Sequence, residues 1–171
     1  MKKILAFSLV VVLSALSLGC GKKMPEGMPN LEPVKLTVTQ DGAPCADAQV
    51  NLQSLDPSNQ WTSGGVTDAQ GVVALVTHGQ YNGVPIGKYK VSVFKKVGEG
   101  TPPPPLPTDE ASEKAYNDYY ESGQTYDLFC LIEKQYTDLN TTPLEIEVVK
   151  GKNELAVDVG APVHDVYIEE R

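Results

Sequence analysis

The chain has few of the residues that enzymes and nucleic-acid-binding proteins use most. Its 171 residues include two histidines, one tryptophan and three cysteines, and its single arginine is the last residue, Arg171. There is no Cys-x-x-Cys pair and no Cys/His cluster with the spacing of a zinc site. The net charge of −8 disfavours a nucleic-acid partner, because an acidic surface repels phosphates.

Sequence patterns of known catalytic sites are missing as well. The chain contains no Ser/His/Asp arrangement, no glycine-rich phosphate loop and no EF-hand pattern. We therefore predict a non-enzymatic protein without a cofactor or metal. An enzyme whose site is assembled from scattered residues stays open as the alternative.

The first residues predict export. Two lysines precede an apolar run of 15 residues, Ile4 to Leu18, which is short for a membrane-spanning helix. A basic start and a short apolar run are typical of a secretory signal. The run stops at Gly19-Cys20, and the segment that follows, residues 21–33, is rich in proline and glycine, which indicates a linker.

Gly19-Cys20 resembles the lipobox of bacterial lipoproteins, although Ser17 stands where that motif usually has a large aliphatic residue. The resemblance implies a signal peptide over 1–19, a lipid on Cys20, a flexible tether over 20–33 and attachment to the cell envelope. Gly21, rather than aspartate, after the cysteine implies the outer membrane in a Gram-negative host. The alternative is an ordinary secretory signal with an incidental cysteine.

The other two cysteines are then alone in an oxidising compartment. We predict a disulfide between Cys45 and Cys130, because exported proteins commonly form one from such a pair. It would fix the long insertion that contains Cys130. The alternative is two buried free thiols that act as small hydrophobic residues.

Hydrophobic residues alternate with polar ones along most of the chain, which predicts strands rather than helices. Seven segments have this pattern: 34–39, 48–55, 61–67, 72–77, 88–96, 143–149 and 154–159. The last two flank the turn sequence KGKN and are expected to form a hairpin. The predicted fold over 34–171 is an all-β, seven-stranded antiparallel β-sandwich.

An insertion at about 98–142 interrupts this pattern. It opens with the proline-rich TPPPPLP, which favours a stiff extended segment. Asp109 then begins a predicted helix that ends near Gly123. This helix contains Tyr116, Tyr119 and Tyr120, which we predict to contact a protein or carbohydrate partner. The alternative is a helix that only covers the edge of the sandwich.

Several motifs occur in an order that resembles the carboxypeptidase regulatory-like, or transthyretin-like, domains of small lipoproteins from planctomycete-type bacteria. These motifs are DGAP, TDAQG, PIGKYKVSV, EKQYTDLNTTPLEIEV and GKNELAVDV. The resemblance covers about 34–159 and implies an Ig-like or transthyretin-like sandwich. Each motif residue also has a structural explanation: Asp68 and Gly71 form a turn, Gly87 permits a tight entry into a strand, and Tyr89 is a corner tyrosine.

The remaining candidates are interpreted as structural. His78 and His164 are far apart in the sequence and are expected on solvated loops. Glu145 and Glu147 alternate with apolar residues, so they should form the wet face of a strand. Lys35 and Asn153 would suit an isopeptide bond, but Lys35 falls on the polar face. The leading hypothesis is a lipid-anchored β-sandwich that binds a partner or acts as a structural spacer at the cell envelope.

Overall fold

The computed structural model describes residues 24–167; the signal peptide and Cys20 predicted above lie outside them. The described chain is mostly β. Its strands and helices are β1 (Leu31–Glu32), β2 (Val34–Gln40), β3 (Ala43–Pro44), β4 (Gln49–Ser54), β5 (Ser63–Val66), β6 (Val72–Ala74), β7 (Val76–Thr77), β8 (Tyr81–Asn82), β9 (Val84–Pro85), β10 (Gly87–Phe94), β11 (Lys96–Gly100), α1 (Glu110–Glu121), β12 (Tyr126–Cys130), α2 (Lys134–Thr137), β13 (Glu145–Val148), β14 (Asn153–Asp158) and β15 (Asp165–Val166).

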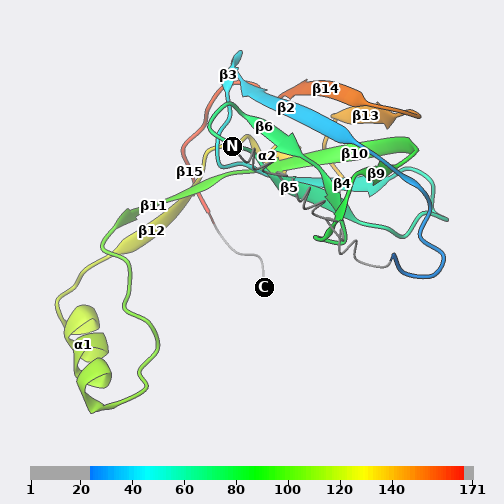
Figure 1. Ribbon diagram of the computed structural model, residues 1–171. Coiled ribbons are helices and arrows are strands. Elements are labelled where there is room, and N and C mark those ends of the chain that lie inside the picture. The colour runs from blue at the N-terminus through cyan, green and yellow to red at the C-terminus, as the bar shows by residue number, and fades with distance from the viewer. Residues whose placement is uncertain (1–23, 168–171) are drawn as a thin grey trace, which may run out of the picture.

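Two larger sheets form the body of the molecule (Figure 1). One has the order β13-β10-β4-β5-β7-β8, and the other has the order β14-β2-β3 with β6 also paired to β2. Two smaller sheets, β1-β9 and β11-β12-β15, are added at the margins. The prediction of an all-β, sandwich-like protein is therefore confirmed.

The alternation seen in the sequence determines which side chains form the core. In β2, Val34, Leu36 and Val38 are buried while Lys35 is exposed. The facing strands β4, β10 and β13 contribute residues to the same buried cluster, including Leu52, which is almost wholly buried. Each fully buried leucine or valine stabilises the fold by roughly 1.5–3 kcal/mol relative to an exposed one.

The segment 72–77, predicted as one strand, is divided between the two sheets. β6 pairs with β2 and β7 pairs with β5, so the chain passes from one sheet to the other at the buried Leu75. The backbone N–H of Leu75 donates to Val34 and its carbonyl accepts from Gly83. This crossing residue keeps both backbone groups satisfied, which allows it to be buried.

The predicted hairpin at the end of the domain is wrong. β13 pairs antiparallel with β10, whereas β14 pairs with β2, so their connection crosses between the sheets. The buried Asn153 side chain shapes this connection, because it accepts from the N–H of Val149 and donates to the carbonyls of Val149 and Gly151. The β14-β2 pairing is also parallel, so the sandwich is not wholly antiparallel as predicted.

Part of the predicted tether is ordered by the sandwich. β1, at Leu31–Glu32, pairs with β9, and the carboxylate of Glu32 accepts from the N–H of Gly151. The sandwich therefore begins a few residues before the predicted boundary at residue 34.

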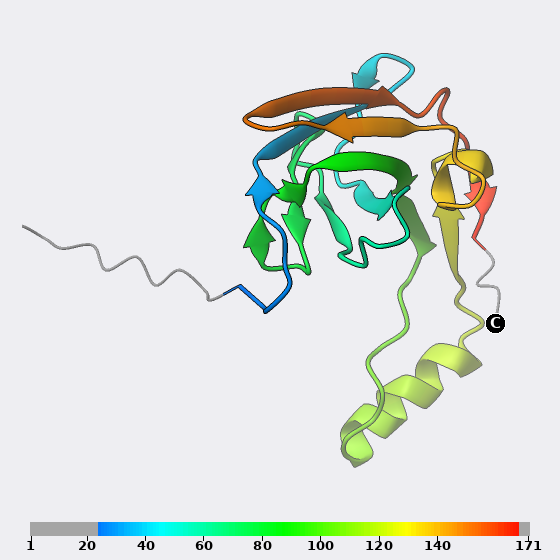
Figure 2. The same ribbon diagram turned by 90° about the vertical axis from the view of Figure 1, so that its right-hand side faces the viewer.

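A projecting arm, residues 96–130, leaves the sandwich where β10 ends. Its stem is the antiparallel pair β11-β12, with Lys96 opposite Cys130 and Gly100 opposite Tyr126. Its tip contains the proline-rich segment and α1, and both views show the tip standing clear of the sandwich (Figures 1 and 2). No residue of α1 is buried. The alternative, that this helix only covers the edge of the sandwich, is therefore wrong.

Candidate functional site

The helix of the arm is stabilised by its own residues. Asp109 is the N-cap: its carboxylate accepts from the N–H of Ser112 at 2.8 Å, while the Ser112 hydroxyl oxygen accepts from the N–H of Asp109 at 3.0 Å. This reciprocal capping box satisfies two donors that a helix start leaves free. Beyond the C-cap Ser122, Gly123 has a φ of 69° and turns the chain away. The predicted start and stop of the helix are confirmed.

The three predicted contact tyrosines have different environments. The Tyr119 hydroxyl donates to the carbonyl of Thr101 at 2.5 Å and ties the helix to the proline-rich segment. The Tyr120 ring lies 4.8 Å from that of Tyr116 and 5.1 Å from that of Tyr119. Tyr116 and Tyr119 are half-buried, whereas Tyr120 is 56% exposed. Hydrogen bonding with Tyr116 raises the pKa of the Tyr120 hydroxyl.

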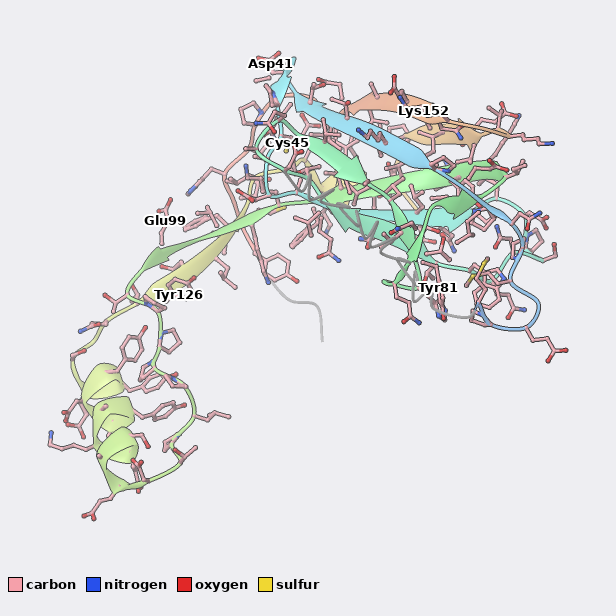
Figure 3. All side chains as sticks on the ribbon, in the orientation of Figure 1. Asp41, Cys45, Tyr81, Glu99, Tyr126 and Lys152 are labelled. Carbon is pink, nitrogen blue, oxygen red and sulfur yellow. The ribbon has the colours of Figure 1, made fainter. Side chains whose placement is uncertain are left out.

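The stem of the arm is built around a glycine. A Cβ at Gly98 would overlap the ring and hydroxyl of Tyr126, which lies across the strand pair. Tyr126 and Glu99 lie in the stem between the sandwich and the helix (Figure 3). The Glu99 carboxylate contacts Nε2 of His164 at 2.9 Å, and the His164 ring stacks on Phe129 at 4.0 Å. The stem is thus held by contacts on both faces.

The arm is strongly acidic. Residues 96–130 include seven acidic and two basic side chains. Both cations have contacts within the chain: Lys114 pairs with Asp118 at 2.6 Å, and Lys96 lies over the Tyr167 ring. Three exposed carboxylates of α1 have no basic partner within the described part of the chain: Glu110, Glu113 and Glu121.

A cavity of about 420 Å³ lies at the root of the arm. Phe94, Cys130 and Ile132 form its apolar lining, and Asp138 and Asp165 are among its polar residues. The Asp138 carboxylate accepts from the backbone and side-chain nitrogens of Asn140. The cavity therefore has an apolar part and an acidic part, but neither histidine lines it.

The predicted disulfide is not found. Cys45 and Cys130 are both free and buried, which corresponds to the alternative kept open above. Cys45 packs at the turn near Gly71, and burial raises the pKa of its thiol, an effect that the Lys95 charge partly offsets. The Cys130 thiol donates to the carbonyl of Ile132 at 3.3 Å. The arm is held by the β11-β12 and β12-β15 pairings without a covalent tie.

The turn residues named from the sequence lie where the chain reverses before β6. The Asp68 carboxylate accepts from the N–H groups of Gln70 and Val72, both at 2.9 Å. Gly71 has a φ of 73°, and a Cβ there would come within 2.5 Å of the carbonyl oxygen of Val38. A side chain at this position would therefore meet backbone strain and a steric clash together.

Gly87 and Tyr89 lie at the start of β10. Gly87 has a φ of 153°. The wholly buried Tyr89 donates its hydroxyl to the carbonyl of Pro85 at 2.7 Å and accepts from Nδ2 of Asn59 at 3.0 Å. Burial raises the pKa of this hydroxyl. Tyr89 therefore fixes the loop that contains Asn59 against the first residues of β10.

The two histidines lie in different parts of the molecule. His78 is exposed after β7 with a φ of 53°, and its ring meets Trp61 edge-on at 5.2 Å. His164 contacts Glu99 on the arm. Of the other structural candidates, Glu145 and Glu147 are exposed as predicted, and Lys35 is exposed while the Asn153 amide is hydrogen-bonded within its own turn. Their described surroundings include no group of three or more residues able to hold a metal.

Sequence reasoning missed two features that the structure reveals. The Glu99–His164 contact joins residues 65 positions apart, and no local pattern links them. A cleft beside Trp61 likewise combines residues near 30, 56–61 and 85–87. The only local signal was the single tryptophan of the chain, which stands at the start of the predicted strand 61–67. Among residues 24–167 no helix is long and apolar enough to cross a membrane.

Comparison with known protein families and with curated proteins gives no match. Among solved structures, the chain is similar to a 9R-lipoxygenase from Cyanothece PCC8801, with 12% identity and a TM-score of 0.33. The alignment covers 80% of this chain and 18% of the lipoxygenase, so the chain spans less than a fifth of that protein. A likeness at this level supports no conclusion about fold or activity.

Proposed function

We propose that this protein is a non-enzymatic, lipid-anchored β-sandwich of the Ig-like or transthyretin-like type that presents its acidic arm to a protein partner at the cell envelope. The observation that carries the proposal is the helix α1, which has no buried residue and stands clear of the sandwich (Figure 2). A helix of 12 residues is marginal in water unless other contacts support it. Among the described residues, this helix has such contacts within the tip but none with the core, so it is ordered without covering the sandwich.

The charge of the arm indicates the kind of partner. Its unpaired carboxylates would repel nucleic acid and anionic lipid and attract a basic protein surface. Tyr120 offers an exposed ring beside them, and an arginine or lysine of the partner would gain a further cation–π contact there. The proposed partner is therefore a protein with a lysine- or arginine-rich face, rather than a carbohydrate.

The proposed anchor would position the arm near the membrane surface. A lipid on Cys20 followed by the tether would hold the sandwich at the membrane while leaving the arm free to reach a neighbour. Labelled fatty acid should enter the wild-type protein and not Cys20→Ser. Equal labelling of both would remove the anchor from the proposal and leave the role of the arm to be tested separately.

Photo-crosslinking in the native envelope tests the role of the arm. A photoreactive residue replaces the exposed Asn117 of α1, and the control position is the exposed Gln53 of β4. We expect a protein adduct from position 117 that weakens as salt is raised, because surface charge attraction is screened. The adduct should also be lost when Glu110, Glu113 and Glu121 are all changed to glutamine.

A matched variant removes the tip without disturbing the sandwich. In the stem, the N–H of Leu131 donates to the carbonyl of Lys95, and the N–H of Thr101 donates to the carbonyl of Thr125. Hydrogen-bonded and non-hydrogen-bonded pairs alternate along an antiparallel ladder, so Glu99 and Asp127 also form a hydrogen-bonded pair. Such a pair suits closure by a two-residue Asn-Gly turn in place of 100–126.

No adduct from position 117, or an adduct unaffected by salt and by the glutamine changes, would overturn the proposed function.

A further inference from the structure

A second cleft lies at the opposite end of β10 from the arm. It has a volume of about 420 Å³, within the usual range for small-molecule sites. The eight-residue strand β10 separates it from the arm by about 25 Å. The residues that matter for its chemistry come from three parts of the chain: Asn30, Asp56, Asn59, Trp61, Pro85 and Ile86.

The polar side of the cleft is preorganised. Asp56 Oδ1 accepts from the N–H of Ser58 at 2.9 Å and from its hydroxyl at 2.7 Å. These bonds fix the carboxylate and lower its pKa, so it is an acceptor at neutral pH. Its second oxygen and the Asn30 amide make no hydrogen bond to the described residues, which leaves them available to a ligand.

Asn59 is held in place from two directions. Its Oδ1 accepts from the N–H of Trp61 at 3.2 Å, and its Nδ2 donates to the hydroxyl of the buried Tyr89 at 3.0 Å. The loop that contains Asp56, Asn59 and Trp61 is therefore tied to the core. Polar groups fixed in this way lose little conformational entropy when a ligand binds.

The other side of the cleft is apolar. Trp61 is partly exposed, and Ile86, also in the lining, is 54% exposed although it is a large aliphatic residue. The edge-on contact with His78 restricts the indole ring. An aromatic ring beside fixed Asp and Asn side chains matches a sugar ring, which has apolar C–H groups on its faces and hydroxyls at its edge.

We propose that this cleft binds a neutral saccharide. Trp61 and Ile86 would contact the face of the ring, while Asp56 and Asn30 would bond its hydroxyls. Asp56 disfavours an acidic sugar, because none of the described residues that line the cleft is basic. The inference does not depend on the function proposed for the arm.

Tryptophan fluorescence reports directly on this cleft, because Trp61 is the only tryptophan in the chain. The purified protein is titrated with maltotriose, cellotriose, triacetylchitotriose and, as the anionic comparison, trigalacturonate. We expect a saturable emission change with at least one neutral trisaccharide and none with trigalacturonate. Asp56→Ala and Asn30→Ala change exposed residues and should each weaken binding about tenfold, equivalent to one lost bond of about 1.4 kcal/mol.

Tyr120→Ala, in the arm, is the matched control and should bind as the wild type does. Ligand-observed NMR with the same four sugars guards against binding that leaves the emission unchanged. The proposal is overturned if neither method detects a neutral trisaccharide. It is also overturned if trigalacturonate binds equally well, or if the two cleft variants bind as tightly as the control.

Discussion

The sandwich and the arm are ordered by different kinds of interaction. The sandwich buries alternating side chains from facing sheets in one cluster, whereas α1 buries none and depends on a capping box, tyrosine contacts and one strand pair. Burial makes a region cooperative, because each residue depends on many others. Local contacts make a region that opens on its own, at a low free-energy cost. A change of the same kind should therefore have unequal effects in the two regions.

Two glycines with nearly the same backbone give the sharpest contrast. Gly71 in the sandwich has a φ of 73° and Gly123 in the arm a φ of 69°, but a Cβ meets backbone atoms only at Gly71. Gly71→Ala should lower the free energy of unfolding by at least about 3 kcal/mol, through strain and overlap together. Gly123→Ala should leave the unfolding midpoint of the sandwich unchanged. Urea denaturation measures both, and similar losses would show that the arm unfolds with the core.

Two tyrosine hydroxyls extend the comparison. Tyr89→Phe leaves Nδ2 of Asn59 and the carbonyl of Pro85 without their partner in the structure, and it should cost about 1–3 kcal/mol. Tyr119→Phe removes the bond to Thr101 in the arm and should not alter global stability. Thermal unfolding of the two variants checks this, and equal stability of Tyr89→Phe and wild type would contradict the assigned role of the corner.

Asp158 tests the electrostatics at the edge of the sandwich. Its pKa is lowered by the Thr39 hydroxyl first and then by the N–H groups of Gly160 and Gly42. Because the folded pKa lies below the unfolded value of about 3.9, the carboxylate contributes stability above about pH 4 and loses it as the pH falls through the folded pKa. Wild type should therefore lose more stability between about pH 5 and pH 3 than Asp158→Asn. Parallel slopes in urea titrations would show that this carboxylate is not linked to folding.

The smallest global effect is expected at the helix cap. Asp109→Ala removes the capping box, which stabilises a helix by about 1 kcal/mol. Amide hydrogen exchange should quicken across α1 while the unfolding midpoint stays that of the wild type. A lower midpoint would mean that the tip and the sandwich unfold as one unit.

The sequence correctly predicted the features that depend on neighbouring residues. The alternation in 34–39 and the cap at Asp109 both depend on neighbouring residues, so strand and helix were placed correctly. The hairpin after β13 was wrong because KGKN is compatible with either a hairpin or a crossing, and the choice depends on β2 and β10, which lie far away in the chain. The disulfide was inferred from the number of cysteines and the compartment. Neither the number of cysteines nor the compartment determines the distance between two of them, and each thiol has its own buried surroundings.

The candidate sites were less predictable than the fold. The tyrosines were found because they are close together in the sequence. The bond that ties Tyr119 to Thr101 joins residues 18 positions apart, so the local pattern does not predict it. The Trp61 cleft combines residues from three separated segments. The pairing of β1 with β9, the pairing of β4 with β10 and the bond from Asn59 to Tyr89 bring these together. Sites of this kind become visible only after the chain is folded.

The parallel pairing of β14 with β2 also sets the order of events during synthesis. Val34 lies opposite Asn153, so β2 must wait for a strand that is synthesised much later. β6 can join the other side of β2 early, but the sandwich closes only after β14 has been made. Long separations of this kind slow folding, because the intervening chain must first be brought together. If the protein is exported as proposed, such a delay would keep the new chain unfolded until it has crossed the membrane.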